Sequence, residues 1–187
     1  MQIEETEIPG AVILTPKRIG DNRGFFSEVW NRKLLAEHGI DVEFVQDNHS
    51  LSQAKGIIRG LHYQAPPHGQ GKLVRCGGGS VWDVAVDVRK GSPAYGKWVG
   101  VELSFENGRQ FYVPEGCLHG FSTLTENAQL LYKCTDYYAP AADGAVHWNS
   151  ADLGIDWRVD GTPQLSEKDA GAPNFAEWDS PFEWSGS

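Results

Sequence analysis

Hydrophobic and aromatic residues in this chain recur in short segments separated by turn residues. Within 81–88, apolar residues occupy the even positions, whereas Asp83 and Asp87 lie on the odd face. This two-residue period is that of a β-strand. Many short strands between turn signals such as Gly77-Gly78-Gly79 predict an antiparallel β-sandwich or barrel. The segments expected to form strands are 24–30, 42–48, 57–63, 72–76, 80–88, 97–105, 109–113, 119–124 and 128–138.

One short helix is predicted from Asn31 to His38. Asn31 can cap the first turn, and Gly39 can adopt the left-handed conformation that ends a helix. The helix should be peripheral to the sheets because it is short.

A chain of 187 residues fits a single domain, 1–187. We expect a core over about 24–138 and a tail over about 139–187 that wraps this core, because the strand pattern loosens after Pro140. Large aromatic side chains should anchor the tail. They are Trp148, Trp157, Trp178 and Trp184.

The balance of charge excludes several classes of partner. Sixteen Lys and Arg against 25 Asp and Glu give a net charge of −9, so no overall field attracts nucleic acid or an anionic membrane. The acidic amino terminus differs from a secretory signal, and no apolar run approaches the roughly 20 residues of a membrane span. We expect a soluble, cytoplasmic protein without nucleic-acid or membrane partners.

Neither cysteines nor histidines have the spacing of a metal site. Cys76, Cys117 and Cys134 are odd in number and lack a C-x-x-C pair, so we expect them to be small buried hydrophobic residues. The six histidines form no H-x-H or H-x-x-x-H pair. The sequence therefore predicts no bound metal.

The densest polar cluster in a strand-like context lies in residues 56–64, GIIRGLHYQ. In an unbroken strand, Ile58, Gly60, His62 and Gln64 share one face, and Gly60 leaves open space beside His62. This arrangement suits a ligand. A structural histidine with one hydrogen bond is an equally good interpretation of His62 alone.

Two other segments place polar groups beside apolar ones. Gln46 and Asn48 continue an apolar stripe from 42 to 44, which favours a barrel with a polar mouth, although a strand emerging into solvent would look the same. Tyr132 shares a strand face with Leu130 and Cys134. Its phenol is either a functional group or a core hydroxyl bonded to a backbone carbonyl.

Several short motifs follow one another over nearly the whole chain. They are Arg23-Gly24-Phe25-Phe26, Gln46-Asp47-Asn48, Arg59-Gly60-Leu61-His62, Lys72-Leu73-Val74-Arg75, Pro114-x-Gly116-x-x-His119-Gly120-Phe121, Leu131-Tyr132 and Ser166-Glu167-Lys168-Asp169. Each motif alone is weakly specific, but the ordered set is highly specific. It resembles the dTDP-4-dehydrorhamnose 3,5-epimerase family. The resemblance implies a cupin-type jelly roll without metal or cofactor, usually a homodimer that exchanges amino-terminal strands.

The resemblance also implies a reaction. The substrate would be dTDP-4-dehydro-6-deoxy-D-glucose, inverted at C3 and C5 to dTDP-4-dehydro-L-rhamnose in dTDP-L-rhamnose biosynthesis. A ketone at C4 acidifies the hydrogens on both neighbouring carbons, so a base on one face and an acid on the other suffice. By resemblance, His62 is the base, Asp169 orients it, Tyr132 is the acid, and Lys72 stabilises the C4 oxygen.

Further residues match positions that bind the substrate in the family. Besides Lys72, the cations Arg23, Arg59 and Lys168 would hold the diphosphate. Tyr138 would stack on thymine. Asp143 stands where the family pattern has Glu, so the resemblance supports that contact less strongly. The residues expected to hold the sugar and thymidine portions are Glu28, Gln46, Asn48 and His119.

One geometric conflict and two alternatives follow. Arg59 and His62 are three residues apart, so an unbroken strand would point them to opposite sides. A bulge at Gly60, or a site shared across a dimer, would reconcile them.

The first alternative to the double epimerase is an epimerase acting at a single centre, C3 or C5, in antibiotic sugar synthesis. The second is a jelly roll that binds a nucleotide sugar without converting it.

Overall fold

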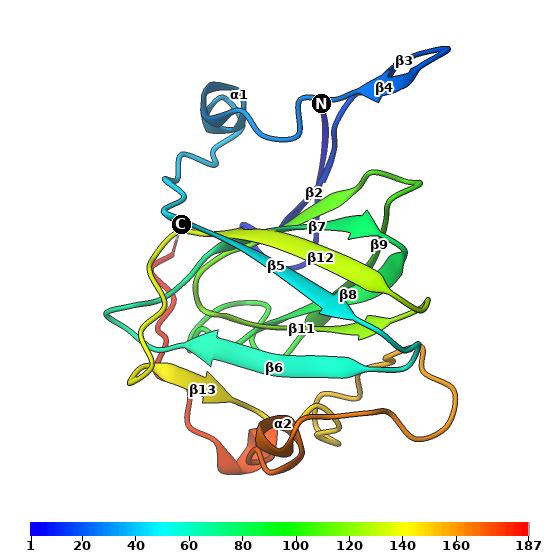
Figure 1. The fold of residues 1–187 in the computed structure, drawn as a ribbon. Helices are drawn as coiled ribbons and strands as arrows, with labels where there is room; N and C mark the ends of the chain where they lie inside the picture. The colour runs from blue at the N-terminus through cyan, green and yellow to red at the C-terminus, as the bar shows by residue number, and fades with distance from the viewer. Residues whose placement is uncertain (187) are drawn as a thin grey trace.

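Two facing antiparallel sheets make up most of the computed structural model, which describes residues 1–186 (Figure 1). The six-stranded sheet has the order β1-β2-β10-β7-β12-β5, and the five-stranded sheet has the order β13-β6-β11-β8-β9. A separate two-stranded ribbon, β3-β4, projects from this body. The predicted fold class, an all-β jelly roll with a few short peripheral helices, is confirmed.

The strands have the following bounds. In the six-stranded sheet they are β1 Gln2–Glu5, β2 Val12–Thr15, β5 Gln46–Ser52, β7 Lys72–Gly78, β10 Gln110–Val113 and β12 Ala128–Cys134. In the five-stranded sheet they are β6 Ile58–Gln64, β8 Ser80–Asp87, β9 Trp98–Ser104, β11 Cys117–Thr123 and β13 Asp143–Ala145, and the ribbon consists of β3 Ile19–Asp21 and β4 Gly24–Phe26.

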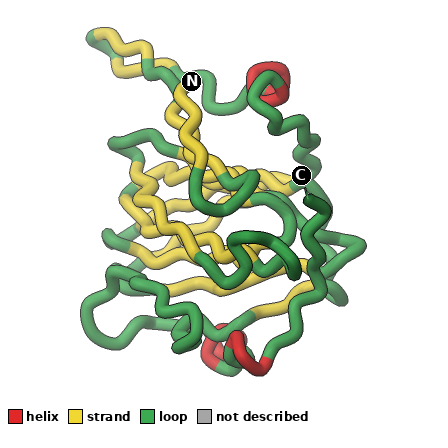
Figure 2. The backbone as a smooth tube through the Cα atoms, turned by 180° about the vertical axis from the view of Figure 1, so that it is seen from behind, coloured by secondary structure: helices red, strands yellow, loops and turns green. Residues whose placement is uncertain are grey.

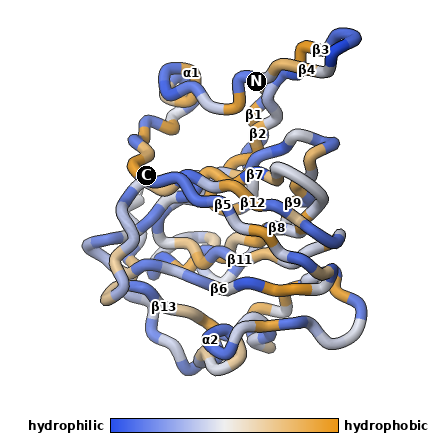
Figure 3. The backbone as a smooth tube through the Cα atoms, in the orientation of Figure 1, coloured by the Kyte–Doolittle hydropathy of each residue, from blue (hydrophilic) through white to orange (hydrophobic). Residues whose placement is uncertain are grey.

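The apolar core lies in three layers. Between the sheets, Val74 and Phe111 of one sheet pack with Val81 and Ala85 of the other. On the outer face of the five-stranded sheet, Val84 belongs to a second cluster that includes residues of the carboxyl-terminal segment. A third cluster covers the outer face of the six-stranded sheet. Figure 3 shows hydrophobic positions recurring along the strands of the body.

Strand β8 alternates as predicted, but both of its faces are buried. The even positions face the carboxyl-terminal segment, where Trp157 is 4% exposed, and the odd positions face the space between the sheets. Asp83 and Asp87 are therefore buried carboxylates, both 0% exposed. Seen from behind in Figure 2, the covering segment on this side of the molecule is mostly loop, with short helical turns at the bottom of the view.

The predicted helix is present as α1, Arg32–Ala36. The Asn31 side chain accepts a hydrogen bond from the backbone N–H of Leu34 at 3.2 Å, and Gly39 has φ +82°. Two further short helices, α2 Glu167–Ala170 and η1 Phe175–Glu177, lie in the carboxyl-terminal segment. Within residues 1–186, no helix has the length and apolar character needed to cross a bilayer.

Several strand boundaries differ from the prediction. The strand expected at 42–48 begins at Gln46, because residues 42 and 44 pack on the outer face of the six-stranded sheet. The strand expected at 128–138 ends at Cys134, where the chain leaves the sheet and crosses to β13. Strands β1, β2, β3 and β13 were not predicted. All three cysteines are free and buried, as expected.

Candidate active site

A bulge in β6 places Arg59 and His62 on the same side of the sheet. Opposite them on β11, Phe121 pairs with Arg59 and His119 pairs with His62, so two residues of β6 face one of β11. The extra residue lies at Gly60, whose φ is +116°. Of the two solutions that the sequence left open, the structure shows the bulge, which resolves the conflict between the two side chains.

The bulge also corrects the parity expected for β6. An unbroken strand would place Ile58 on the face of His62, but Ile58 packs with Leu61 in the outer cluster. A side chain at Gly60 would not fit, because its Cβ would lie 2.7 Å from the Gly120 Cα and from the His119 carbonyl oxygen. Glycine at this position is therefore required by both conformation and space.

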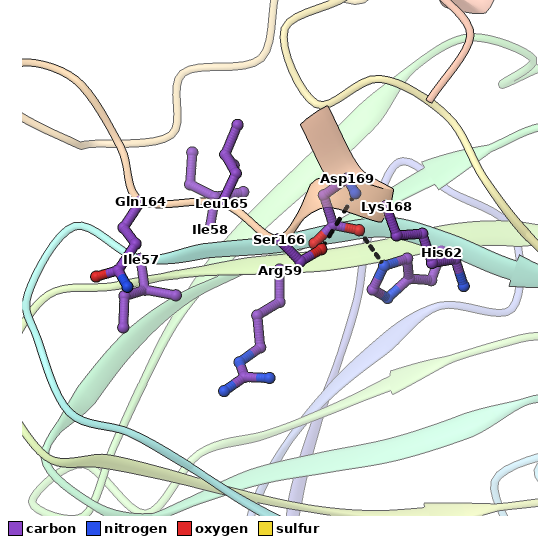
Figure 4. Close-up of a pocket in the computed structure, with 9 residues that line it drawn as sticks. All are labelled: Ile57, Ile58, Arg59, His62, Gln164, Leu165, Ser166, Lys168 and Asp169. Carbon is purple, nitrogen blue, oxygen red and sulfur yellow. Dashed lines mark hydrogen bonds and ion pairs between the residues drawn. The ribbon is translucent and has the colours of Figure 1, made fainter. Parts of the chain in front are cut away.

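His62 and Asp169 form a close pair from two distant parts of the chain. Nε2 of His62 lies 2.6 Å from Oδ1 of Asp169, which belongs to α2 (Figure 4). The Ser166 hydroxyl caps this helix by accepting the backbone N–H of Asp169. The Asp169 side chain is only 3% exposed, whereas the imidazole is 36% exposed. The imidazole is therefore accessible to a ligand and the carboxylate is not.

Hydrogen bonding keeps the Asp169 carboxyl ionised. Burial raises the pKa of this carboxyl. The hydrogen bond and positive charge of His62 and the backbone N–H of Gly60 together lower it by more, so the pKa lies below its ordinary value. An ionised carboxylate accepts the proton on Nε2, which leaves Nδ1 of a neutral His62 with a free lone pair. The pair can therefore act as an oriented general base.

The catalytic candidates His62, Lys72 and Tyr132 line one cavity of about 430 Å³. His62 comes from β6 in the five-stranded sheet, while Lys72 of β7 and Tyr132 of β12 come from the six-stranded sheet. The imidazole and the phenol thus reach the cavity from opposite sheets. Five predicted binding residues line the same cavity: Gln46, Asn48, Tyr138, Asp143 and Lys168.

A second cavity of about 320 Å³ adjoins the first, since His62 and Lys168 line both. Arg59 and Asp169 contribute to its wall (Figure 4). The Arg59 guanidinium is held by the Ser52 hydroxyl at 3.1 Å. Two cations therefore lie along this second cavity.

Lys72 is a nearly buried cation. It is 9% exposed, and its ammonium has no hydrogen-bond or ion-pair partner among residues 1–186. Burial lowers its pKa, an effect opposed by the nearby acidic groups, which include Cys134 and Asp143. A desolvated ammonium on a cavity wall is suited to stabilise negative charge on a bound molecule.

The environment of Tyr132 favours its protonated form. Burial raises the pKa of its phenol, Cys134 raises it further, and the positive charge of Arg59 opposes the shift. The phenol therefore carries its proton at neutral pH and can donate it.

Hydrogen bonds connect the remaining residues of the first cavity. The amide of Gln46 donates to Oδ1 of Asn48 at 3.1 Å. The Tyr138 hydroxyl lies 3.4 Å from Oδ2 of Asp143, which also forms an ion pair with Lys168. Asp143 thus occupies the cavity wall and contacts two other predicted residues.

His119 does not line either cavity. It is 7% exposed, and its Nε2 lies 2.9 Å and 3.1 Å from the two carboxylate oxygens of Asp83. Burial raises the pKa of Asp83, an effect that His119 opposes. His119 thus forms a buried pair with Asp83 in this chain, and its contact with a ligand stays a prediction.

Arg23 and Glu28 also lie outside the cavity of their own chain. Arg23 is on the projecting β3-β4 ribbon (Figure 1), where its guanidinium pairs with Asp21 at 2.5 Å and is 85% exposed. Glu28 is exposed between β4 and α1 and accepts a hydrogen bond from Asn31. One chain by itself does not bring these two residues to the site.

Sequence reasoning gave no role to Gln64, Gln70 and Tyr63, although all three line the first cavity. Gln64 was detectable, because the period of the strand places it on the face of His62. Gln70 lies in the turn after β6, and Tyr63 lies on the face of β6 opposite His62, where it packs against Trp178, so neither residue carries such a signal. Among residues 1–186, no three His, Cys, Asp or Glu side chains converge as a metal-binding group requires.

Known proteins are similar to this chain in both sequence and fold. The profile described as dTDP-4-dehydrorhamnose 3,5-epimerase matches residues 5–177. The dTDP-4-dehydrorhamnose 3,5-epimerase of Salmonella typhimurium is 53% identical over 92% of this chain and 94% of that protein.

Solved structures agree with this match. The dTDP-6-deoxy-D-glucose-3,5-epimerase from Legionella pneumophila, in complex with dTDP-4-keto-L-rhamnose, has a TM-score of 0.94 at 48% identity, covering 98% of each chain. A 3'-monoepimerase from Streptomyces bikiniensis in complex with dTDP-quinovose has a TM-score of 0.86 at 37% identity, covering 91% of this chain and 86% of the other. The chain therefore belongs to the dTDP-4-dehydrorhamnose 3,5-epimerase family.

Proposed function

We propose that this protein is a cofactor-independent isomerase that epimerises dTDP-4-dehydro-6-deoxy-D-glucose at C3 and C5, giving dTDP-4-dehydro-L-rhamnose for dTDP-L-rhamnose biosynthesis. One observation carries the proposal. The imidazole of His62, paired with Asp169, and the phenol of Tyr132 enter the same cavity from opposite sheets. Inversion of a carbon requires a base and an acid on opposite faces, which this arrangement supplies.

The first half of each inversion is proton removal. Nδ1 of His62 accepts the proton from C3 or C5, and the electron pair of that C–H bond moves toward C4. The carbonyl becomes an enolate, and its oxygen gains negative charge. Asp169 stabilises the imidazolium that results, because its carboxylate is ionised and 2.6 Å away.

The second half is proton delivery from the opposite face. Tyr132 gives its phenolic proton to the same carbon, the enolate returns to a ketone, and exchange with solvent restores the tyrosine and the histidine. Lys72 stabilises the C4 oxygen in between, since its ammonium lies on the cavity wall without a partner among the described residues. The ketone itself acidifies the hydrogens, so this chemistry requires no further electron sink.

Cations beside the base account for binding of an anionic substrate to an acidic protein. Arg59 and Lys168 line the cavity that adjoins His62, where they would hold the diphosphate. Tyr138, exposed at the cavity edge, would stack on thymine. Gln46, Asn48 and Asp143 would then contact the sugar and thymidine portions.

The amino-terminal ribbon supports a homodimer in which arms are exchanged. Arg23 and Glu28 match binding positions of the family but lie away from the cavity of their own chain. The ribbon also exposes apolar side chains, with Phe26 70% and Ile19 61% exposed. We infer that the ribbon reaches a second copy of the chain and brings Arg23 to that copy's site.

Inversion at one centre is the second candidate. It is favoured by the structural likeness to the 3'-monoepimerase, whose TM-score is 0.86. The double reaction is preferred because relatives of higher identity, 53% and 48% against 37%, carry the 3,5-epimerase name. The cytoplasmic location expected from the sequence stays a prediction.

Isotope exchange tests these functions in one experiment. The purified protein is incubated with dTDP-4-dehydro-6-deoxy-D-glucose in heavy water, and NMR locates the deuterium. We expect label at both C3 and C5. Label at C3 alone would select the single-centre reaction, and dTDP binding without any label would indicate a binding protein.

Substitution of the base completes this test. His62→Ala should abolish exchange at both carbons while the circular dichroism spectrum stays unchanged. His38→Ala, a change of the same kind at an exposed position in the turn after helix α1, should leave exchange intact. Full exchange by a folded His62→Ala variant would remove the proposed base.

A further inference from the structure

Two glutamines from opposite sheets hold the segment that carries Tyr138. This segment, residues 135–142, leaves β12 of the six-stranded sheet and crosses to β13 of the other sheet (Figure 1). Gln46 begins β5 in the first sheet, and Gln64 ends β6 in the second. The crossing contains no helix or strand of its own, so its backbone groups need partners from elsewhere.

The amide nitrogen and the amide oxygen of Gln64 form three hydrogen bonds, all with backbone atoms. Its amide nitrogen donates to the carbonyl of Tyr137 at 2.9 Å and to the carbonyl of His68. Its amide oxygen accepts the backbone N–H of Ala139 at 2.8 Å. The side chain is 4% exposed. Gln64 thus binds the backbone on both sides of Tyr138.

Gln46 binds the residue in between. Its amide oxygen accepts the backbone N–H of Tyr138 at 2.9 Å. Side-chain hydrogen bonds therefore hold the backbone at three consecutive residues, 137 to 139. The side chain of Tyr138 remains 56% exposed and lines the cavity. An exposed aromatic ring has a defined position only if its backbone does.

The bonding pattern at Gln64 requires a carboxamide. Two carbonyl oxygens need two N–H donors, and one backbone N–H needs an acceptor. A carboxylate at this position would have no donor and would face two carbonyl oxygens. A thioether of the same length would make none of the three bonds. Only glutamine has both the reach and the correct set of groups.

We propose that Gln64 is a positioning residue that sets the place of Tyr138 at the cavity and thereby the affinity for the nucleotide portion of the ligand. The inference rests on the proposed function, because it assigns the nucleotide to Tyr138. Gln64 acts through the backbone of residues 137–139. It takes no part in proton transfer at His62.

The first test measures dTDP affinity by titration calorimetry. Gln64→Glu should weaken dTDP binding about tenfold, a factor that corresponds to the loss of one or two ordinary hydrogen bonds. The value of kcat at saturating substrate should change by less than about threefold, so the effect should appear in KM. Gln53→Glu, the same change at an exposed position, is the matched control and should bind dTDP like the wild type.

A pH series separates this role from general damage to the fold. A buried carboxyl facing carbonyl oxygens titrates at raised pH, and once protonated it regains one donor. The dTDP dissociation constant of Gln64→Glu, divided by that of wild type, should therefore decrease as the pH is lowered from about 8 to about 5.5. The ratio for Gln64→Met, which has no titratable group, should stay constant over the same range.

A double-mutant cycle tests whether Gln64 acts through Tyr138. In a Tyr138→Ala background, Gln64→Met should cost little additional dTDP affinity, because the ring it positions is gone. Full additivity of the two losses, or dTDP affinity equal to wild type in both Gln64 variants, would overturn the inference. A wild-type protein that binds no dTDP would overturn the proposed function and this inference together.

Discussion

The carboxylate of Asp169 lies 2.6 Å from Nε2 of His62, although 107 residues separate them in the chain. A one-turn helix capped by Ser166 places the aspartate beside β6, where it lines the same cavity as Arg59 and His62. The carboxylate also accepts the backbone N–H of Gly60 within the bulge. The feature that turns Arg59 toward the site thus also helps to hold the partner of the proposed base.

Asp169→Asn should lower kcat by about two orders of magnitude, because an amide cannot stabilise the imidazolium or hold the correct tautomer. Steady-state kinetics on the purified variant would measure this loss. Asp179→Asn, which removes an exposed ion pair with Lys90, is the matched control. An Asp169→Asn variant with wild-type kcat would show that the carboxylate has no catalytic role.

The same carboxylate should make the stability of the fold depend on pH in the acid range. Its pKa is lower in the folded chain than its ordinary value, so its contribution is fully present above the pKa of the unfolded chain. The contribution is lost as pH falls through the lower, folded value. Urea unfolding at several pH values should show the stability advantage of wild type over Asp169→Asn shrinking below about pH 4.

Tyr132→Phe should separate proton removal from proton delivery. The ring still fills its place, but the acid is gone, so net epimerisation should fall by about two orders of magnitude or more. Slow deuterium exchange with retained configuration should persist, because His62 remains. NMR in heavy water would report both quantities, and unchanged epimerisation would assign the acid role to another group.

Gly60→Ala should destabilise the fold more than a comparable glycine substitution elsewhere. Its Cβ would lie 2.7 Å from backbone atoms of Gly120 and His119. Gly161 also has a positive φ, +78°, but nothing lies within 4 Å of its Cβ position. We expect about 1 kcal/mol for Gly161→Ala and about 3 kcal/mol or more for Gly60→Ala, measured by urea unfolding. Equal losses would contradict the steric argument.

Mixed dimers can test the exchange of arms. The variants Arg23→Ala and His62→Ala are each expected to be nearly inactive. If Arg23 acts in the partner's site, a heterodimer of the two variants contains one intact site, and random mixing restores about a quarter of wild-type activity. Refolding the two variants together and assaying the mixture would measure this. If mixed dimers form and the mixture is as inactive as its components, Arg23 acts in the site of its own chain.

The three cysteines should be unreactive in the folded protein. Burial raises the pKa of Cys117 to about 12, and it also raises the pKa values of Cys76 and Cys134. Thiol reagents attack the thiolate, so none of the three should be labelled by a chromogenic disulfide at neutral pH. All three should react in denaturant. Rapid labelling of one thiol in the native protein would show that its site opens locally.

Local patterns in the sequence determined a substantial part of this structure. The alternation in 81–88 identified β8, and Asn31 with Gly39 identified α1, because capping and strand periodicity depend on residues close in the chain. The sequence also indicated a bulge at Gly60 as one of two ways to bring Arg59 and His62 to one cavity, the other being a site shared across a dimer. Motif order identified the family, since the spacing of many weak signals is hard to meet by chance.

Tertiary structure alone decided the rest, because it depends on contacts between distant segments. The burial of Asp83 follows from facing sheets and from His119 on the next strand, and no local pattern reports it. The strand expected to reach 138 ends at Cys134 because the chain must cross between sheets there, and the pairing of Gln64 with residues 137 and 139 exists only in that crossing. Periodicity records which face a residue occupies, whereas the partner across that face is chosen by the packing of the whole chain.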